Sequence, residues 1–152
     1  MNSKSITMKK VHAAARLLKA QNGCDYKTAF TIASNDIWEI YRLHKKANAI
    51  TENVKALFDL SAKQTNNCVD LKVASTLINF KKDLKKEVIR VGIELGTLAN
   101  ENTNQFAELS TAFNIALQIK SNIFNVFNPK QFFVFAQTAI KYNVPFNFNF
   151  AL

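Results

Sequence analysis

Two histidines and two cysteines are the side chains of this sequence best suited to metal binding or nucleophilic catalysis. A zinc site needs three or four ligands held together, and His12 and His44 have no carboxylate cluster or CxxC pair beside them. A thiol nucleophile needs a base and a third group that orients the base, and no such group is evident for Cys24. Phosphate-binding glycine loops and the serine-hydrolase and zinc-protease motifs are also missing from the sequence. We therefore predict a protein that is not an enzyme and holds no metal or cofactor. We expect the two histidines to face solvent or cap helices, and the thiols of Cys24 and Cys68 to be incidental and reduced.

Basic side chains are the most prominent chemical feature of the chain. Lys and Arg number 20 against 11 Asp and Glu, which leaves a formal net charge of +9. Such a chain is attracted to nucleic acid, to an anionic membrane or granule surface, or to an acidic protein face, although a basic balance also serves solubility alone. Candidate contacts near the N-terminus are Lys9, Lys10, Arg16, Lys19, Arg42, Lys45 and Lys46. A second group, spaced to form one band along a helix, comprises Lys81, Lys82, Lys85, Lys86 and Arg90.

That second band carries a cost that must be weighed against its use. Like charges four residues apart on a helix destabilise it by about 0.2–0.5 kcal/mol per pair, and Asp83 and Glu87 dilute the band only in part. A band kept at that cost is a candidate contact for phosphates or for an acidic partner. A solvated helix face is the commoner use of such residues.

Aromatic residues gather at the opposite end of the chain. Ten of the 13 Phe residues lie in the last 47 residues, where few charges occur. At the very end, Phe146, Phe148 and Phe150 alternate with Asn, a period of two that is typical of extended chain. We predict an extended tail that packs along a groove or adds to a partner's sheet edge, with these three Phe as a candidate apolar interface.

The elements that must position these groups are predicted to be helices, because only three Gly and two Pro occur and strand-rich folds need many turns. We expect helices at residues 8–20 and 26–46, joined at Asn22-Gly23 and capped by Asp25, and then at 51–94, 97–126 and 130–142. The predicted fold is all-α, with an N-terminal helical hairpin (1–48) and an antiparallel long-helix bundle (49–152) that form one compact unit. A Phe-rich C-terminal helix and the extended tail close this bundle. The core is expected to place Phe124, Phe127, Phe132 and Phe135 against Leu57, Leu60, Leu71, Leu95, Leu98 and Leu109.

An internal repeat relates residues 60–74 to residues 98–112. Both copies carry Leu and Ala on one helix stripe and interrupt it with Thr-Asn. Polar residues on such a seam help to fix oligomeric state, so the repeat predicts self-association. Chance similarity between two amphipathic helices is the alternative.

Two resemblances to known families bear on function. A basic helix, a Gly turn and a second helix with Ile-Trp near its end are carried by Met8, Lys9, Lys10, His12, Arg16, Gly23, Tyr26, Lys27, Ala29, Phe30, Ala33, Ile37, Trp38, Lys45 and Lys46. Residues 8–46 thereby resemble a segment that recurs in small phage and prophage proteins, which implies a mobile-element origin and an accessory factor of the kind that can act against host defences. A second likeness rests on LFDLSAKQTNNCVDL, on NQFAELSTAFNIALQ and on the helix opening at Asn128-Pro129. These features make residues 53–140 loosely similar to phasins, which coat polyhydroxyalkanoate granules. The Phe density and the Trp-bearing head depart from that family.

Three functions follow as expectations. The first is a phage-type accessory protein that binds a host protein or ribonucleoprotein complex stoichiometrically, with a CRISPR-type defence complex as a possible target. The second is a phasin-like granule coat, and the third is a basic helical module that binds nucleic acid weakly, non-specifically and in a salt-sensitive manner. The start of the chain has no apolar signal region, and no uncharged apolar run approaches the ~18 residues of a membrane span, so we expect a protein of the host bacterial cytoplasm.

Overall fold

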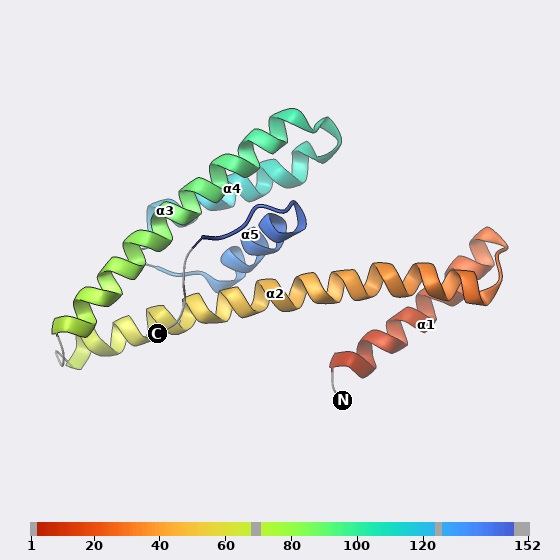
Figure 1. Cartoon of the computed structure of the whole chain (residues 1–152), viewed down its shortest axis with the longest axis horizontal. Coiled ribbons are helices and arrows are strands. Elements are labelled where there is room, and N and C mark those ends of the chain that lie inside the picture. Colours follow the sequence, from red (N-terminus) through yellow and green to blue (C-terminus); the bar gives the residue numbers. More distant parts are fainter. Residues whose placement is uncertain (1–2, 68–70, 124–125, 148–152) are drawn as a thin grey trace. The chain divides into compact units, whose positions relative to one another are not determined.

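The structure, a computed structural model, describes residues 3–67, 71–123 and 126–147. Within these ranges all regular elements are helices, which confirms the all-α prediction (Figure 1). They are α1 (Ser3–Asn22), α2 (Tyr26–Asn67), α3 (Leu71–Glu101), the short 3-10 helix η1 (Thr103–Gln105), α4 (Phe106–Asn122) and α5 (Pro129–Lys141). The chain divides into two compact units, Met1–Lys45 and Lys46–Leu152, and α2 runs through the boundary between them.

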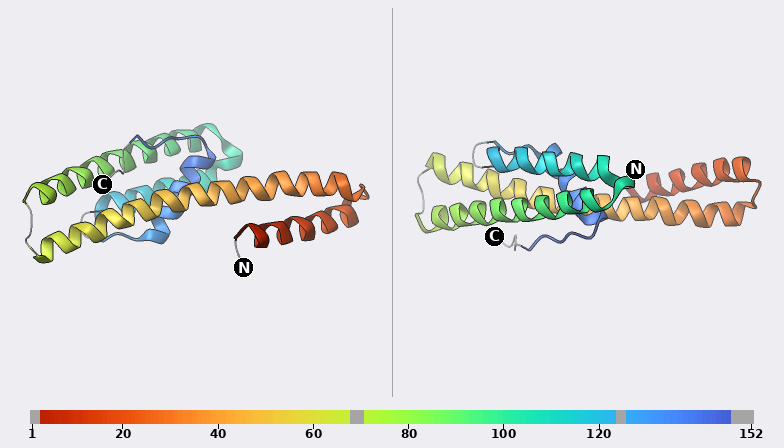
Figure 2. Two further views of the ribbon diagram at one scale, coloured as in Figure 1. Left: turned by 60° about the horizontal axis from the view of Figure 1, so that its bottom comes forward. Right: turned by 90° about the horizontal axis from the view of Figure 1, so that it is seen from above.

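The first unit is the predicted helical hairpin. Its two helices lie alongside each other in every view (Figure 2), and they bury the small residues Val11, Ala15, Ala29 and Ala33 between them. Gly23 has φ +67°, a left-handed conformation that favours glycine, and so ends α1 as predicted. The backbone N–H of Thr28 donates to the Asp25 carboxylate at 3.0 Å. This bond confirms the cap, and hydrogen bonds from the side chain and then from the backbone of Thr28 lower the pKa of Asp25.

The predicted break between residues 46 and 51 is wrong. The helix predicted at 51–94 begins at Thr51, yet Thr51 is buried within α2, and its hydroxyl donates to the carbonyl of Ala47 at 2.8 Å. A threonine that bonds the carbonyl four residues earlier needs no helix terminus. Since residues 47–50 contain neither Gly nor Pro, nothing interrupts the helix there.

The predicted boundary between the third and fourth helices is also wrong, because α3 continues through Gly92 and Gly96 to Glu101. A Cβ built on Gly92 would lie 2.7 Å from the Cβ of Ala116, and one built on Gly96 would lie 3.1 Å from the Phe113 ring. The two glycines therefore serve the close approach of α3 to α4 and do not end a helix. The chain leaves the α conformation at Asn102, which has an extended backbone. Each copy of the 60–74/98–112 repeat thus spans the end of one helix and the start of the next, whereas the sequence predicted positions inside helices.

The start of α5 agrees closely with the prediction. The Asn128 side chain accepts from the backbone N–H groups of Lys130 and Gln131 at 3.1 and 3.3 Å, and Pro129 occupies the first helical turn, where its missing N–H costs nothing. The helix ends at Lys141, and Asn143 follows with φ 59°. The helix therefore ends one residue before the predicted bound of 142 and before Pro145 is reached.

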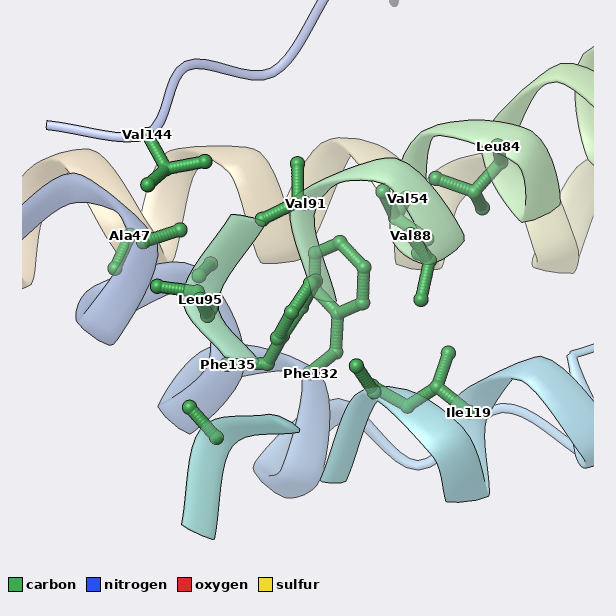
Figure 3. Close-up of a cluster of buried hydrophobic side chains, with 14 of the residues drawn as sticks. Ala47, Val54, Leu84, Val88, Val91, Leu95, Ile119, Phe132, Phe135 and Val144 are labelled. Atoms are coloured by element: carbon green, nitrogen blue, oxygen red, sulfur yellow. The ribbon is translucent and has the colours of Figure 1, made fainter. Parts of the chain in front are cut away.

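The core of the second unit gathers side chains from α2, α3, α4 and α5 (Figure 3). Phe132 and Phe135 are fully buried there together with Leu95 and Leu109, as predicted. Leu71 was expected in this core but is 91% exposed, because it is the first residue of α3 and not a mid-helix residue. Leu57 is also buried, and Leu60, Leu98 and Phe127 are partly buried. Phe124 lies outside the described residues.

Candidate functional site

An open groove of about 470 Å³ runs between the two helices of the hairpin unit. Helix α1 contributes Ile6, Thr7 and Lys10, and α2 contributes Ile37, Ile40, Tyr41 and His44. Among the described residues, none that lines the groove is a carboxylate. Its walls are largely apolar, and its ionisable side chains are Lys10, Tyr41 and His44, so it suits a ligand that brings both apolar and anionic groups.

The local sequence explains why this groove stays open. Successive small residues close the hairpin core near Ala15 and Ala29, whereas isoleucines stand at its other end. Ile6 is 43% exposed and Ile40 is 60% exposed, so each leaves much of a large aliphatic side chain in contact with water. The neighbouring Trp38 ring packs edge-on against Tyr41, with centroids 5.3 Å apart, and so positions the Tyr41 side chain.

Sequence reasoning missed this groove for a specific reason. The first helix was expected to start at Met8, which leaves Ile6 outside it, whereas α1 begins at Ser3. Ile37, Ile40, Tyr41 and His44 fall inside the helix predicted at 26–46, and His44 was expected to face solvent or cap a helix. The missed signal is the four-residue spacing of Ile6 and Lys10, which places them on one face of a longer α1.

The predicted N-terminal contact residues do not all gather at the groove. Lys10 lines it. Lys46 falls in the second unit. The remaining predicted contacts are exposed and lie elsewhere on the two helices of the hairpin unit: Lys9, Arg16, Lys19, Arg42 and Lys45. The unit therefore presents a cationic surface with one apolar groove in it.

The two histidines have different surroundings. The Nδ1 atom of His12 lies 2.6 Å from the Tyr26 hydroxyl, and its ring stacks near those of Tyr26 and Phe30. His44 lines the groove. Cys24 is half-buried, with its Sγ 3.9 Å from the Leu18 carbonyl oxygen. In the described ranges no three metal-binding side chains cluster.

The second basic band is not a single surface. The Lys81 ammonium group lies 5.0 Å above the centre of the Phe58 ring, and desolvation lowers the pKa of this lysine. Arg90 is engaged within its own chain, as described below. Lys82 and Lys86 are exposed, and Lys85 is partly buried. Two of the five predicted contacts therefore already serve the packing of the second unit.

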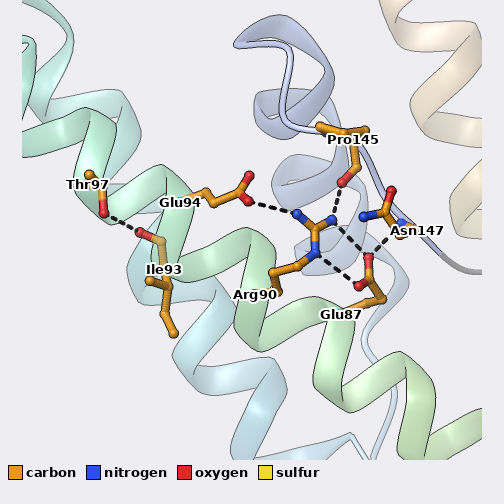
Figure 4. Close-up of polar contacts among 7 residues, drawn as sticks. All are labelled: Glu87, Arg90, Ile93, Glu94, Thr97, Pro145 and Asn147. Carbon is orange, nitrogen blue, oxygen red and sulfur yellow. Dashed lines mark hydrogen bonds and ion pairs between the residues drawn. The ribbon is translucent and has the colours of Figure 1, made fainter.

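Arg90 fastens the C-terminal segment to α3 (Figure 4). Its guanidinium donates two bonds to Glu87, at 3.0 and 2.9 Å, one to Glu94 at 2.9 Å, and one to the carbonyl of Pro145. Glu87 in turn accepts from the backbone N–H of Asn147 at 2.6 Å. The hydrogen bond from Arg90, helped by the one from Asn147, holds the pKa of Glu87 below its usual range.

The candidate apolar interface at the tail is described only at Phe146. This ring is partly buried, with its centroid 6.3 Å from that of Phe132 and 5.8 Å from that of Phe135. Phe146 thus packs on the core of its own unit. Phe148 and Phe150 lie outside the described residues.

Two further observations concern the whole chain. Among the described residues, no helix has the length and apolar character needed to cross a membrane. Comparison with models of known protein families, with curated proteins and with solved structures found no match. The phage-type and phasin-like resemblances therefore remain predictions from the sequence.

Proposed function

We propose that this protein is a phage- or prophage-type accessory protein that acts in the host bacterial cytoplasm by stoichiometric binding and not by catalysis. Its partner is a host protein or ribonucleoprotein complex, and a defence complex of the CRISPR type is a candidate target. The observation that carries the proposal is the hairpin groove: exposed isoleucines and Lys10 in a groove without carboxylates, on a unit with many basic residues.

The chemistry of the groove favours an acidic protein face over a bare polyanion. Phosphates gain from Lys10 and the surrounding basic residues but gain nothing from Ile6 and Ile40, whose burial needs apolar atoms. A protein segment with carboxylates beside apolar side chains satisfies both. Complementary charge then raises the association rate, and burial of the isoleucines slows dissociation.

The alternatives draw less support from the packing. A granule coat needs an exposed apolar helix face, whereas Phe132 and Phe135 of the Phe-rich helix are fully buried. A nucleic-acid module would use the basic residues of the hairpin together with the second basic band, and two members of that band, Lys81 and Arg90, are engaged with other groups of the chain.

The test is capture of a partner by the full-length protein and by matched variants. Ile40→Glu places a charge in the apolar wall, and Ile32→Glu makes the same change at a similarly exposed isoleucine of α2 outside the groove. Lys10→Glu and Lys27→Glu form a second pair that changes the net charge equally. Because all four side chains are exposed, each variant should keep its helical circular dichroism.

We expect wild type, Ile32→Glu and Lys27→Glu to hold a host protein or ribonucleoprotein at a fixed molar ratio in light scattering after gel filtration. Ile40→Glu and Lys10→Glu should bind at least about tenfold more weakly, since an unpaired charge would be buried at the contact. Nuclease treatment of the mixture distinguishes direct binding to a protein from attachment through a shared nucleic acid, because only the second is lost when the nucleic acid is digested. Failure of the wild-type protein to hold any macromolecule at a fixed ratio would refute the proposed function. Equal binding by Ile40→Glu and Ile32→Glu would show that the hairpin groove is not the binding site.

A further inference from the structure

A second open groove, of about 350 Å³, lies between α3 and α4 in the other unit. Its lining includes Ile93, Gly96, Asn100, Phe106, Ser110 and Phe113. No residue of the lining carries a formal charge, in a chain whose net charge is +9. The proposed function makes no use of this surface.

The glycine packing of α3 explains the shape of the groove. Because Gly96 has no side chain, the Phe113 ring lies directly against the α3 backbone and forms the floor. Ile93 and Phe106 remain 59% and 51% exposed beside that floor. Each is a large apolar side chain in water, and its burial would contribute about 25 cal/mol for every Å² removed from solvent.

Charge selects the occupant of this groove. A symmetric dimer brings each surface against its own copy, so any basic surface of this chain would meet an equally basic one. The uncharged groove is a surface that two such copies can share without that repulsion. Glu94 and Glu108, close to the lining in sequence, are paired within one chain, with Arg90 at 2.9 Å and with Lys141 at 3.0 Å. Glu101, which follows the lining residue Asn100, is exposed.

We propose that the α3–α4 groove is the interface of a symmetric homodimer, with Phe106 of each copy seated in the groove of the other. Phe106 is half exposed at the groove that it lines, so across a two-fold axis each ring can be buried in the groove of the other copy. This assignment also narrows the self-association predicted from the repeat. The second repeat copy supplies Phe106 and Ser110, whereas the first has Cys68 and the charged Lys72 at the matching positions, so the two copies are not equivalent.

Sedimentation equilibrium of the full-length protein tests the interface. We expect a mass of twice 17.2 kDa at tens of micromolar for the wild type. Phe106→Glu and the milder Ile93→Gln should raise the dimer dissociation constant at least about tenfold. Ile78→Glu, at a similarly exposed isoleucine of α3 outside the groove, should leave it unchanged.

Salt provides an independent check. Added salt screens the repulsion between two chains of charge +9, so the dimer should tighten between about 50 mM and about 500 mM NaCl. A monomer at all concentrations, or equal weakening by Ile78→Glu and Ile93→Gln, would overturn the proposal. So would a dimer that dissociates as salt rises, because its interface would then depend on opposite charges. None of these outcomes bears on partner capture by the hairpin groove.

Discussion

Replacing Gly92 by Ala should destabilise this protein, although alanine is the better helix former. Gly92 lies inside α3, where Gly is about 0.8–1.0 kcal/mol less favourable than Ala. On helix propensity alone the substitution would therefore stabilise the protein by nearly 1 kcal/mol. The packing opposes this gain, because the new Cβ would lie 2.7 Å from the Cβ of Ala116.

The opposing cost is that of overpacking a buried contact. The Ala116 methyl group is fixed to the α4 backbone and cannot rotate away, so the two helices must separate. Overpacking of this kind costs about 1–3 kcal/mol, which leaves a net loss of up to about 2 kcal/mol. Gly96→Ala is the matched control. Its Cβ would meet the Phe113 ring at 3.1 Å, and this partly buried ring can shift, so we expect a change between zero and about 1 kcal/mol of added stability.

Urea unfolding followed by circular dichroism at 222 nm measures both variants. The double variant Gly92→Ala/Ala116→Gly removes the contact and should recover part of the loss. A gain in stability for Gly92→Ala equal to that for Gly96→Ala would refute the packing argument. The α3–α4 spacing would then be set by something other than the glycine.

Three smaller predictions concern single polar contacts. Glu87→Gln should lower the free energy of unfolding by about 1–3 kcal/mol at pH 7, because it weakens the bond to Arg90. Since the folded pKa of Glu87 is lowered, wild type should lose this advantage over the variant as pH falls below about 4.5. Urea titrations at several pH values measure both effects. Burial and then the bond to Glu108 raise the pKa of Tyr142 to about 12 from 10.0, so this contribution to stability is complete below pH 10 and is lost as pH rises to about 12. Absorbance at 295 nm should accordingly show a late-titrating phenol that Tyr142→Phe removes. Asn128→Ala should cost about 1 kcal/mol by thermal or urea unfolding, since two backbone N–H groups lose their acceptor.

Local sequence signals predicted the parts of the fold that local physics decides. Gly23 ends α1 and Asp25 caps α2 because a left-handed turn and a carboxylate acceptor act within a few residues. Asn128 and Pro129 start α5 for similar reasons. The burial of Phe132 followed from composition, because so dense an aromatic segment must leave water.

The errors lie where a partner distant in sequence decides the outcome. Gly92 indicates a helix end when it is considered alone, yet in the fold it makes room for Ala116. Thr51 fits a cap equally well until its burial and its bond to Ala47 are known. The hairpin groove was missed because the length of α1 was underestimated, and length depends on packing against α2 as well as on propensity.

The two grooves differ in charge, and this difference separates their roles. Binding at the hairpin groove involves Lys10 and an anionic partner, so it should weaken as salt rises. Association through the uncharged α3–α4 groove is opposed by repulsion between two chains of net charge +9. Salt screens this repulsion, so the dimer should strengthen as the salt concentration rises. A dimer would carry two hairpin grooves, and a partner with two acidic segments within reach of both would gain avidity without any new contact. At rising salt the intrinsic affinity of each groove falls while the dimer fraction grows, so the apparent affinity for such a partner should fall less steeply in wild type than in Phe106→Glu. If the apparent affinity for the partner fell equally steeply with salt in wild type and in Phe106→Glu, dimerisation and partner binding would not be linked.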